Sequence, residues 1–597
     1  MASVRLTQPR FTPAPIILRK LVVVRAESLT PHMRRVVVGG PELGAFRRDG
    51  LDLPAFASPA FDDHVKLIFA PGGDLADALP VQRARSIDWL PSEVRETRDY
   101  TPIVVDEETI AFDFVIHSSG SAAERGPAEA WASAARPGDD VWLVGPKSST
   151  VVPTDVDWAL LIGDETALPA LRRFFTERPV AGPVRAVVAV PAEAARQPLG
   201  ERDDDHVTWV IAEPGDPRAL IDAVTALPRP PGRPYVWAAA ESRALLPIRK
   251  FVKRELDADK SNTDITGYWH RRAAETAQAE PAAAGDDGAG SAVVDSPVSW
   301  FAVRAALQLG LLEAVDAATL DRGGVAAAIG VDPHRLDPLL DLLLACRVLA
   351  TVDGSVTLGE VGDDLLTDEH CRERFDGADA DAALLVGDLA DALRAGESVP
   401  QRRFGRSHAT GVHDDPDAYA ELVEQAERLA FLVPGIGELP GLADPGVAFA
   451  GPGAAVVAEG LSRAGVLSGR ATIVTAGEPD GVRDTSSPLD GLTFREAWTD
   501  HDTVVLVYAL GYRDDVEART VLAEARRYAR RLVMVEPVAG DALDPRYLEA
   551  AVVSSAAVGR GPRDAAELAD LAADAGWAPT AQTALGWGVT AVVCERS

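Results

Sequence analysis

The regular alternation of apolar strand-like runs with helical runs is the feature that most restricts the fold of this chain. Four runs are predicted as strands, at 158–162, 184–190, 207–211 and 235–239. Helical runs follow or separate them, at 170–178, 217–226 and 242–256. Because parallel strands need a long crossover, which is usually a helix, this alternation predicts a parallel sheet covered by helices.

The same alternation returns towards the C-terminus. Strand-like runs recur at 447–450, 471–475, 503–508, 532–536 and 589–594, with polar and helical segments between them. Residues 436–597 are therefore predicted as a second α/β domain, of the Rossmann-like kind.

The segment before the first α/β domain has a different rhythm. Between Leu18 and Thr150, short alternating runs are separated by turn signals such as Gly39-Gly40-Pro41 and Pro137-Gly138-Asp139. Many short strands punctuated in this way predict an antiparallel β-barrel. We therefore expect a barrel over 1–152 and a nucleotide-binding α/β domain over 153–272.

The two halves of the chain are joined by residues 273–296, which are rich in Ala, Gly and Asp without an apolar period. This composition predicts a flexible linker. After it, helical spacing recurs at 298–315, 336–349 and 418–432. An Asp353-Gly354 turn between short apolar runs predicts a two-stranded wing. Residues 297–435 are therefore predicted as a helical winged-helix domain, and the fold class as multidomain.

Composition excludes several classes of function. A net charge of −32 over 597 residues disfavours nucleic acid and anionic membranes as partners. Three widely spaced cysteines without CxxC spacing predict neither a disulfide framework nor a protein-held metal cluster. No apolar run of about eighteen residues occurs, so we expect a soluble cytoplasmic protein without membrane insertion.

A candidate nucleotide site follows the first strand of the α/β domain. Residues 158–162 end in Gly163-Asp164-Glu165-Thr166 and then open into a helix. Glycine permits close approach of the backbone, and the free N–H groups of a helix start point at an anion. This motif is weak alone, but it follows an Arg98-Asp99-Tyr100-Thr101 run and a helix start at Gly126-Pro127-Ala128.

These motifs together resemble the siderophore-interacting protein family, which comprises flavin-dependent ferric-siderophore reductases built on the ferredoxin-reductase plan. The resemblance runs through the first 272 residues in the family's order. Its motifs are Asp63-His64-Val65-Lys66-Leu67, Arg98 to Pro102, His117, Gly145-Pro146, Gly163 to Pro169 and Gly267-Tyr268-Trp269.

The resemblance implies FAD, with NADH or NADPH as reductant. Arg98 would pair with an FAD phosphate, and Tyr100 and Thr101 would contact the isoalloxazine. The start of a helix facing the diphosphate would come from Gly126, Pro127, Ala128 and Trp131, with His117 as a further cofactor contact. His117 and Trp131 are equally compatible with purely structural roles. The family's second arginine is replaced by Ile103.

The substrate implied by the resemblance is a ferric siderophore, whose anionic oxygen donors favour cationic side chains. The candidates are Lys66, Trp269, Arg271 and Arg272. Cations between Lys250 and Lys260 are equally well a solvated helix face. The sequence does not choose between NADH and NADPH. It slightly favours NADH, because Glu193 would repel a 2′-phosphate and Arg196 is the single nearby cation that could bind one.

Residues 297–597 resemble small-molecule O-methyltransferases with a winged-helix dimerisation domain. The positions that bind S-adenosylmethionine in that family are changed here. Phe449 replaces an acid, Pro452 removes a backbone donor, Ala455 fills a glycine site, Thr475 replaces a ribose-binding acid, and Gly511 stands at the general base. The resemblance therefore implies a pseudoenzyme used for dimerisation or substrate binding, within a homodimer.

The sequence thus favours an FAD-dependent NAD(P)H:ferric-siderophore oxidoreductase, in which the flavin and not a side chain is the catalyst. Two alternatives remain. One is a bifunctional S-adenosylmethionine-dependent O-methyltransferase or tailoring enzyme, and the other is a non-catalytic siderophore-binding protein.

Overall fold

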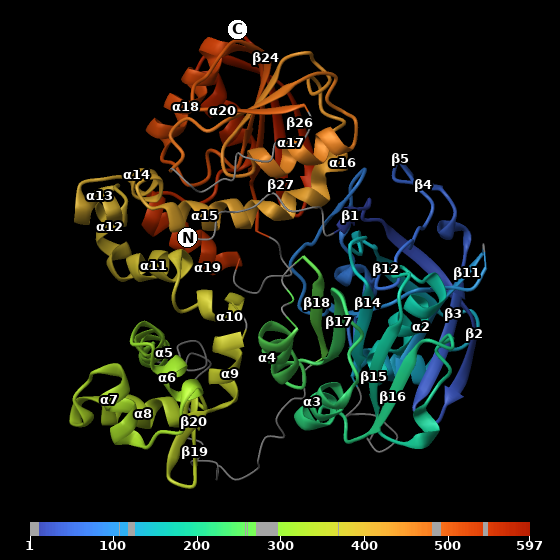
Figure 1. The fold of residues 1–597 in the computed structure, drawn as a ribbon. Helices are drawn as coiled ribbons and strands as arrows, with labels where there is room; N and C mark the ends of the chain where they lie inside the picture. Colours follow the sequence, from blue (N-terminus) through green and yellow to red (C-terminus); the bar gives the residue numbers. More distant parts are fainter. Residues whose placement is uncertain are drawn as a thin grey trace.

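The computed structural model describes residues 11–106, 108–116, 126–256, 258, 261–269, 297–367, 369–479, 491–540 and 547–597. Figure 1 shows a barrel-like sheet and a first α/β part in blue and green, a helical part in yellow, and a second α/β part in orange and red. The predicted linker at 273–296 lies outside the described residues.

The N-terminal part is built on an antiparallel sheet of seven strands, as the alternating runs predict. Their order is β10 (Ile103–Val104), β11 (Thr109–Val115), β3 (Met33–Gly39), β2 (Leu18–Thr30), β12 (Asp140–Val144), β6 (Val65–Phe69) and β9 (Glu96–Tyr100). Apolar side chains such as Leu21, Val36 and Phe112 form its core. The short helix α1 (Pro127–Ala134) packs on β11 and β3.

The first α/β part has a parallel sheet of five strands. Their order is β16 (His206–Ile211), β15 (Val184–Val190), β14 (Trp158–Gly163), β17 (Pro234–Glu241) and β18 (Thr263–Trp269). The helices are α2 (Leu168–Glu177), α3 (Pro217–Ala226) and α4 (Leu246–Glu255). The four predicted strands are confirmed, and β18 is an additional edge strand.

One predicted helix in this part is too long. The helix expected over 242–256 begins only at Leu246. The carboxylate of Glu241 accepts from the backbone N–H groups of Arg243 and Ala244, at 2.7 and 3.0 Å. These bonds hold residues after β17 in a turn, so the helix starts one turn later.

The helical part contains two helices where one stretch was predicted at 298–315. Helix α5 (Val298–Gln308) ends before Gly310, whose φ of 65° is left-handed, and α6 (Leu311–Ala317) follows. Next come α7 (Arg322–Ile329), α8 (Pro333–Ala345) and the hairpin of β19 (Leu349–Val352) with β20 (Ser355–Leu358). The hairpin turns at Asp353-Gly354, as predicted; the assignment as a winged helix remains a prediction.

The remaining helices of this part lead to the second α/β part. They are α9 (Glu360–Thr367), α10 (Glu369–Glu373), α11 (Ala378–Leu384), α12 (Leu389–Ala395), α13 (Val399–Phe404), α14 (His408–His413), α15 (Pro416–Gln425), the 3-10 helix η6 (Ala426–Leu432) and α16 (Val433–Ile436). Among the described residues, no single helix has the length and apolar character to cross a membrane; only the bent pair α5 and α6 meets both criteria together.

The second α/β part has a seven-stranded sheet. The order is β23 (Leu492–Arg495), β22 (Ala471–Val474), β21 (Val447–Ala450), β24 (His501–Val507), β25 (Ala529–Pro537), β27 (Val589–Arg596) and β26 (Trp577–Gly586). Strand β27 runs antiparallel to both neighbours. Helices α17 (Ala454–Arg463), α18 (Asp515–Tyr528) and α20 (Ala565–Asp574) pack on this sheet, whereas α19 (Tyr547–Val558) packs against α11 to α14 of the helical part.

The barrel-like part contacts the second α/β part directly. The contact is made by the hairpin of β7 (Val81–Gln82) and β8 (Ile87–Asp88), which meets the turn between β26 and β27. Trp587 N–H donates to the Ile87 carbonyl at 3.0 Å, and Gly588 N–H donates to Asp88 Oδ1 at 3.1 Å. Nearby, the rings of Phe11 and Phe431 stack at 4.8 Å.

Candidate functional site

A cavity of about 480 Å³ lies between the barrel-like sheet and the parallel sheet of the first α/β part. The parallel sheet contributes residues at or beyond the carboxyl end of every strand, namely 212–216, 189–191, 164–166, 240 and 266–269. Open α/β sheets bind ligands outside the carboxyl ends of their strands. The position of the cavity is therefore that of a ligand site.

The barrel side of the cavity carries the predicted flavin motif at the end of β9. Arg98, Asp99, Tyr100 and Thr101 all line the cavity. The ring of Tyr100 packs against Phe114 with centroids 4.4 Å apart, so it has a core contact as well as a cavity face. Burial raises the pKa of its hydroxyl, which therefore stays protonated.

Arg98 is already paired. Its Nη2 donates to Glu96 Oε2 at 2.9 Å, and its Nη1 donates to the Thr97 carbonyl at 2.8 Å. The two paired side chains are 46% and 40% exposed. Exposed ion pairs contribute little stability, so the guanidinium can turn to an incoming phosphate at small cost.

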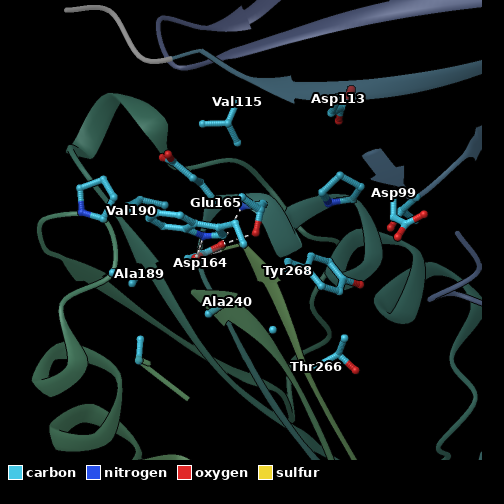
Figure 2. A pocket seen from close by; sticks show the side chains of 18 of the residues that line it. Asp99, Asp113, Val115, Asp164, Glu165, Ala189, Val190, Ala240, Thr266 and Tyr268 are labelled. Atoms are coloured by element: carbon cyan, nitrogen blue, oxygen red, sulfur yellow. Dashed lines mark hydrogen bonds between the residues drawn. The ribbon is translucent and has the colours of Figure 1, made fainter. Parts of the chain in front are cut away.

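Asp164 fixes the centre of the cavity wall. Its carboxylate accepts from Thr166 N at 2.9 Å, Thr166 Oγ1 at 2.5 Å, Glu241 N at 3.0 Å and Trp269 Nε1 at 2.8 Å. Figure 2 marks this network at the middle of the pocket. Its direct effect is to hold the Trp269 indole, a predicted substrate contact, against the end of β14. Burial raises the pKa of Asp164, and the hydrogen bonds oppose that rise.

Glu165 differs from its neighbour. Its side chain is 5% exposed, lines the cavity, and has an Oε2 atom with no hydrogen-bond partner among the described residues. Burial, with the charge of Asp164, raises the pKa of Glu165 to about 7. Figure 2 shows it between Asp164 and Val115. A buried polar atom without a partner is costly, so this carboxyl is suited to a polar group of a ligand.

The other predicted cofactor residues are distributed unevenly. Gly126, Pro127, Ala128 and Thr166 line the cavity, whereas Gly163 and Trp131 do not. Gly163 lies beneath the wall, where a Cβ atom would come within 2.6 Å of Ala167 Cβ. Trp131 packs on Phe114 with centroids 5.7 Å apart. His117 lies outside the described residues.

The predicted substrate cations are not brought together. Lys66 Nζ donates to both carboxylate oxygens of Asp99, at 2.8 and 3.0 Å, and does not line the cavity. Lys250 pairs with Asp316 of α6 at 3.1 Å. Trp269 lines the cavity, and Arg271 and Arg272 lie outside the described residues.

Several cavity residues were not identified from the sequence. They are Asp62, Asp113, Glu129, Glu213 and Asp216, and Tyr268 lines the cavity beside them although the sequence marked it only as part of a family motif. Tyr268 lies in β18 and lines the cavity together with Thr101 of the barrel-like part. Burial raises the pKa of Asp62 to about 6. A signal was present for Glu213 and Asp216, since both follow the predicted strand at 207–211, where a carboxyl-edge ligand lies.

In the second α/β part, several residues at or near the positions expected to hold a methyl donor are bonded to or packed against other residues of the chain. Phe449 is fully buried in the core. His413 donates from Nδ1 to the Gly477 carbonyl beyond β22, and its Nε2 accepts from Arg513 Nη2 at 2.9 Å. Next to Gly511, Glu536 Oε1 accepts from the backbone N–H groups of Ala509 and Leu510. The loops after β22 and β24 are thereby tied to α14.

Comparison with known proteins separates the two halves. Residues 22–150 match the model of the siderophore-interacting FAD-binding domain, and residues 156–272 match that of the siderophore-interacting protein. A protein of Escherichia coli K12 named NADPH-dependent ferric-chelate reductase is 31% identical over 260 residues, which are 42% of this chain and 93% of that protein.

Solved structures resemble either half. The crystal structure of a siderophore utilization protein from T. fusca is 32% identical, covers 44% of this chain and 97% of its own, and has a TM-score of 0.38. An O-methyltransferase from neocarzinostatin biosynthesis, crystallised with S-adenosylmethionine and 2-hydroxy-5-methyl naphthoic acid, is 22% identical. It covers 52% of this chain and 100% of its own, with a TM-score of 0.42.

Proposed function

The chain belongs, over its first 272 residues, to the siderophore-interacting protein family, and on that premise we propose that it is an NAD(P)H-dependent flavoprotein that reduces ferric siderophores. Hard oxygen donors hold Fe(III) more tightly than Fe(II), so reduction releases the metal. We propose a cytoplasmic location for this reaction because it needs a nicotinamide reductant.

The residues present fit FAD. The cavity of about 480 Å³ joins the flavin motif at 98–101 to the start of α1. Arg98 can give a phosphate two parallel N–H donors, and Tyr100 offers an aromatic face. Two features oppose tight binding: Ile103 in place of a second arginine, and Glu129 in the first turn of α1.

The chemistry that bound FAD supplies is acceptance of a hydride and donation of single electrons. The protein supplies position and electrostatics. Asp164 holds the Trp269 indole at the cavity wall, and Tyr268 of the sheet lines the same cavity as Thr101 of the barrel-like part. With a pKa of about 7, Glu165 is protonated in part of the molecules at neutral pH, and in that form it offers an O–H donor without a negative charge.

One observation carries the proposal: a single cavity is lined both by the flavin motif and by the carboxyl edge of the nucleotide sheet. The test is an anaerobic titration of the purified full chain with NADH and NADPH. We expect a flavin absorption spectrum that bleaches, and then recovers when a ferric siderophore is added while a chelating dye reports Fe(II). Protein that neither contains nor binds FAD would refute the proposal. Bound flavin that no nucleotide bleaches would favour the siderophore-binding alternative.

For the C-terminal half, we propose a non-catalytic role in assembly. His413 of α14 bonds the Gly477 carbonyl and Arg513. These bonds connect the loops after β22 and β24 to the helical part, across the edge where a methyl donor would bind. Pro452 has no N–H to offer in the loop after β21. The bifunctional methyltransferase alternative predicts S-adenosylmethionine binding at that edge, which calorimetry with the full chain decides.

The assembly we propose is a homodimer through this half. Large apolar side chains are exposed on its helices, including Phe301 of α5, Leu393 of α12, Phe404 of α13 and Leu548 of α19. Helices α12, α13 and α19 pack against one another, and exposed apolar side chains on adjoining helices support an interaction surface there. Light scattering after size exclusion should give twice the chain mass, and a monomer at micromolar concentration would contradict the proposal.

A further inference from the structure

We propose that the cavity selects NADH over NADPH, and that Glu213 and Asp216 are the specificity-determining residues. The inference rests on the proposed function, because it concerns the nucleotide that reduces the flavin. It assigns a role to two acidic residues that lie at the far end of the cavity from the flavin motif.

The position of the flavin motif fixes the direction in which the nucleotide must lie. The nicotinamide has to reach the flavin, whose motif at Arg98 to Thr101 lies beside β18 and β14. Figure 2 shows Asp99 and Tyr268 towards one end of the pocket, Asp164 and Glu165 in the middle, and Ala189 and Val190 towards the other. The rest of a dinucleotide therefore extends along the carboxyl edge towards β15 and β16, where its adenosine ribose lies.

That end of the cavity carries acidic side chains. Glu213 and Asp216 both line the cavity after β16. Asp216 also caps α3, because its Oδ1 accepts from Arg218 N at 2.9 Å. The start of this helix is a natural place for a phosphate, but here it already carries a carboxylate of its own.

The loop that presents these acids is fixed in place. Gly215 between them has a φ of 74°. A Cβ atom there would come within 3.1 Å of Glu241 Cγ and 3.4 Å of Trp269 Cη2. The loop therefore packs closely on the wall that Asp164 organises, which places both acidic residues at the cavity.

Few basic side chains line the cavity to compensate the charges of Glu213 and Asp216. Among the described residues that line the cavity, His64 and Arg98 are the basic ones, and both belong to the barrel-like part. Arg196 pairs with Glu193 at 2.8 Å, and Arg218 does not line the cavity. A 2′-phosphate would meet carboxylates and be repelled, whereas a ribose 2′-hydroxyl can donate to one of them.

The experiment compares NADH with NADPH on the flavin-loaded full chain, and NAD⁺ with NADP⁺ by calorimetry. We expect kcat/KM for flavin reduction to favour NADH by at least about tenfold, with the same order in the two dissociation constants. Raising the salt concentration should narrow the gap, because salt screens repulsion between exposed charges. Equal affinities, or a preference for NADP⁺, would overturn the inference.

Variants assign the effect to residues. Glu213→Gln and Asp216→Asn remove one charge each, and asparagine keeps an oxygen to cap α3. Each should strengthen NADP⁺ binding several-fold relative to NAD⁺. Asp222→Asn, on α3 and outside the cavity lining, is the matched control and should leave the ratio unchanged. An unchanged ratio in both cavity variants overturns the inference. If neither nucleotide reduces the flavin, the proposed function fails, and the calorimetric ratio still decides the selectivity.

Discussion

The pair between Arg98 and Glu96 makes FAD affinity a quantitative test of the flavin site. Arg98→Ala removes one charge-assisted phosphate contact. Hydrogen bonds to charged groups contribute about 1.5–3 kcal/mol, which corresponds to FAD binding weaker by about 10- to 150-fold. Before it can bind, Arg98 must leave Glu96, and an exposed pair of this kind is worth about 0.2–1 kcal/mol.

The free energy of the Arg98–Glu96 pair predicts that substitution of Glu96 changes FAD affinity in the opposite direction. Glu96→Gln frees the guanidinium in advance, so FAD should bind more tightly by about 1.5- to 5-fold. Arg98→Lys keeps the charge and loses the planar fork, and we expect an affinity between wild type and Arg98→Ala. Arg47→Ala is the control, because Arg47 pairs with Asp52 on an exposed hairpin and does not line the cavity.

The assay is titration of the apoprotein with FAD, followed by flavin fluorescence, with dissociation constants fitted for all five proteins. Agreement requires that the dissociation constant for FAD rises in Arg98→Ala and falls in Glu96→Gln, although both residues lie in the same strand. FAD affinity within twofold of wild type in Arg98→Ala would refute the assignment of this residue. Weaker binding in Glu96→Gln would instead refute the reasoning about the pair.

Three further predictions concern other parts of the chain. Lys66→Ala should raise KM for the ferric siderophore and leave flavin reduction by the nucleotide intact. Because Lys66 neutralises Asp99, Asp99→Asn should lower that KM. Steady-state assays at low salt measure both changes. The raised pKa of Glu165, about 7, means that the folded state holds a proton that the unfolded state loses above pH 4.5. This group therefore adds up to about 3 kcal/mol to the free energy of unfolding at low pH, and that contribution is lost as pH rises towards 7. In Glu165→Gln, the free energy of unfolding measured with urea at pH 5 and pH 8 should lose this part of its pH dependence. The same pH dependence in the variant and the wild type would contradict the prediction. Calorimetry should detect no S-adenosylmethionine binding to the full chain, and micromolar binding would overturn the non-catalytic assignment.

How much of the fold the sequence could predict depended on burial. The strands at 158–162, 184–190 and 447–450 are nearly or fully buried, and their continuous apolar runs identified them. Strands β18 and β26 were missed because both lie at sheet edges and most of their side chains are at least partly exposed. The break at Gly310 was missed because apolar spacing continues through it, although its φ is left-handed.

The candidate site was predictable only where one segment carries the whole signal. The motifs at 98–101 and 163–166 are local, and most of their residues line the cavity. Glu213 and Asp216 come from the loop after β16 and Tyr268 comes from β18, and only the sheet order brings these segments to one edge. The pairing of Lys66 with Asp99 follows from the register of β6 with β9, which composition could not reveal, so a residue expected to be a free cation is neutralised.

Contacts reach the carboxyl edge of the C-terminal sheet from two sides, and they support an assembly role better than any single substitution does. Over β22 and β24, His413 bonds the Gly477 carbonyl and Arg513. Over β25 and β27, the turn at 586–588 is held by the barrel-like part, since Val589 pairs with Pro537 at the end of β25. A methyl donor and its acceptor need exposed backbone donors along this edge. Opening it would break contacts to the barrel-like part, so we expect the C-terminal half to fix the position of the barrel and not to turn over a substrate of its own.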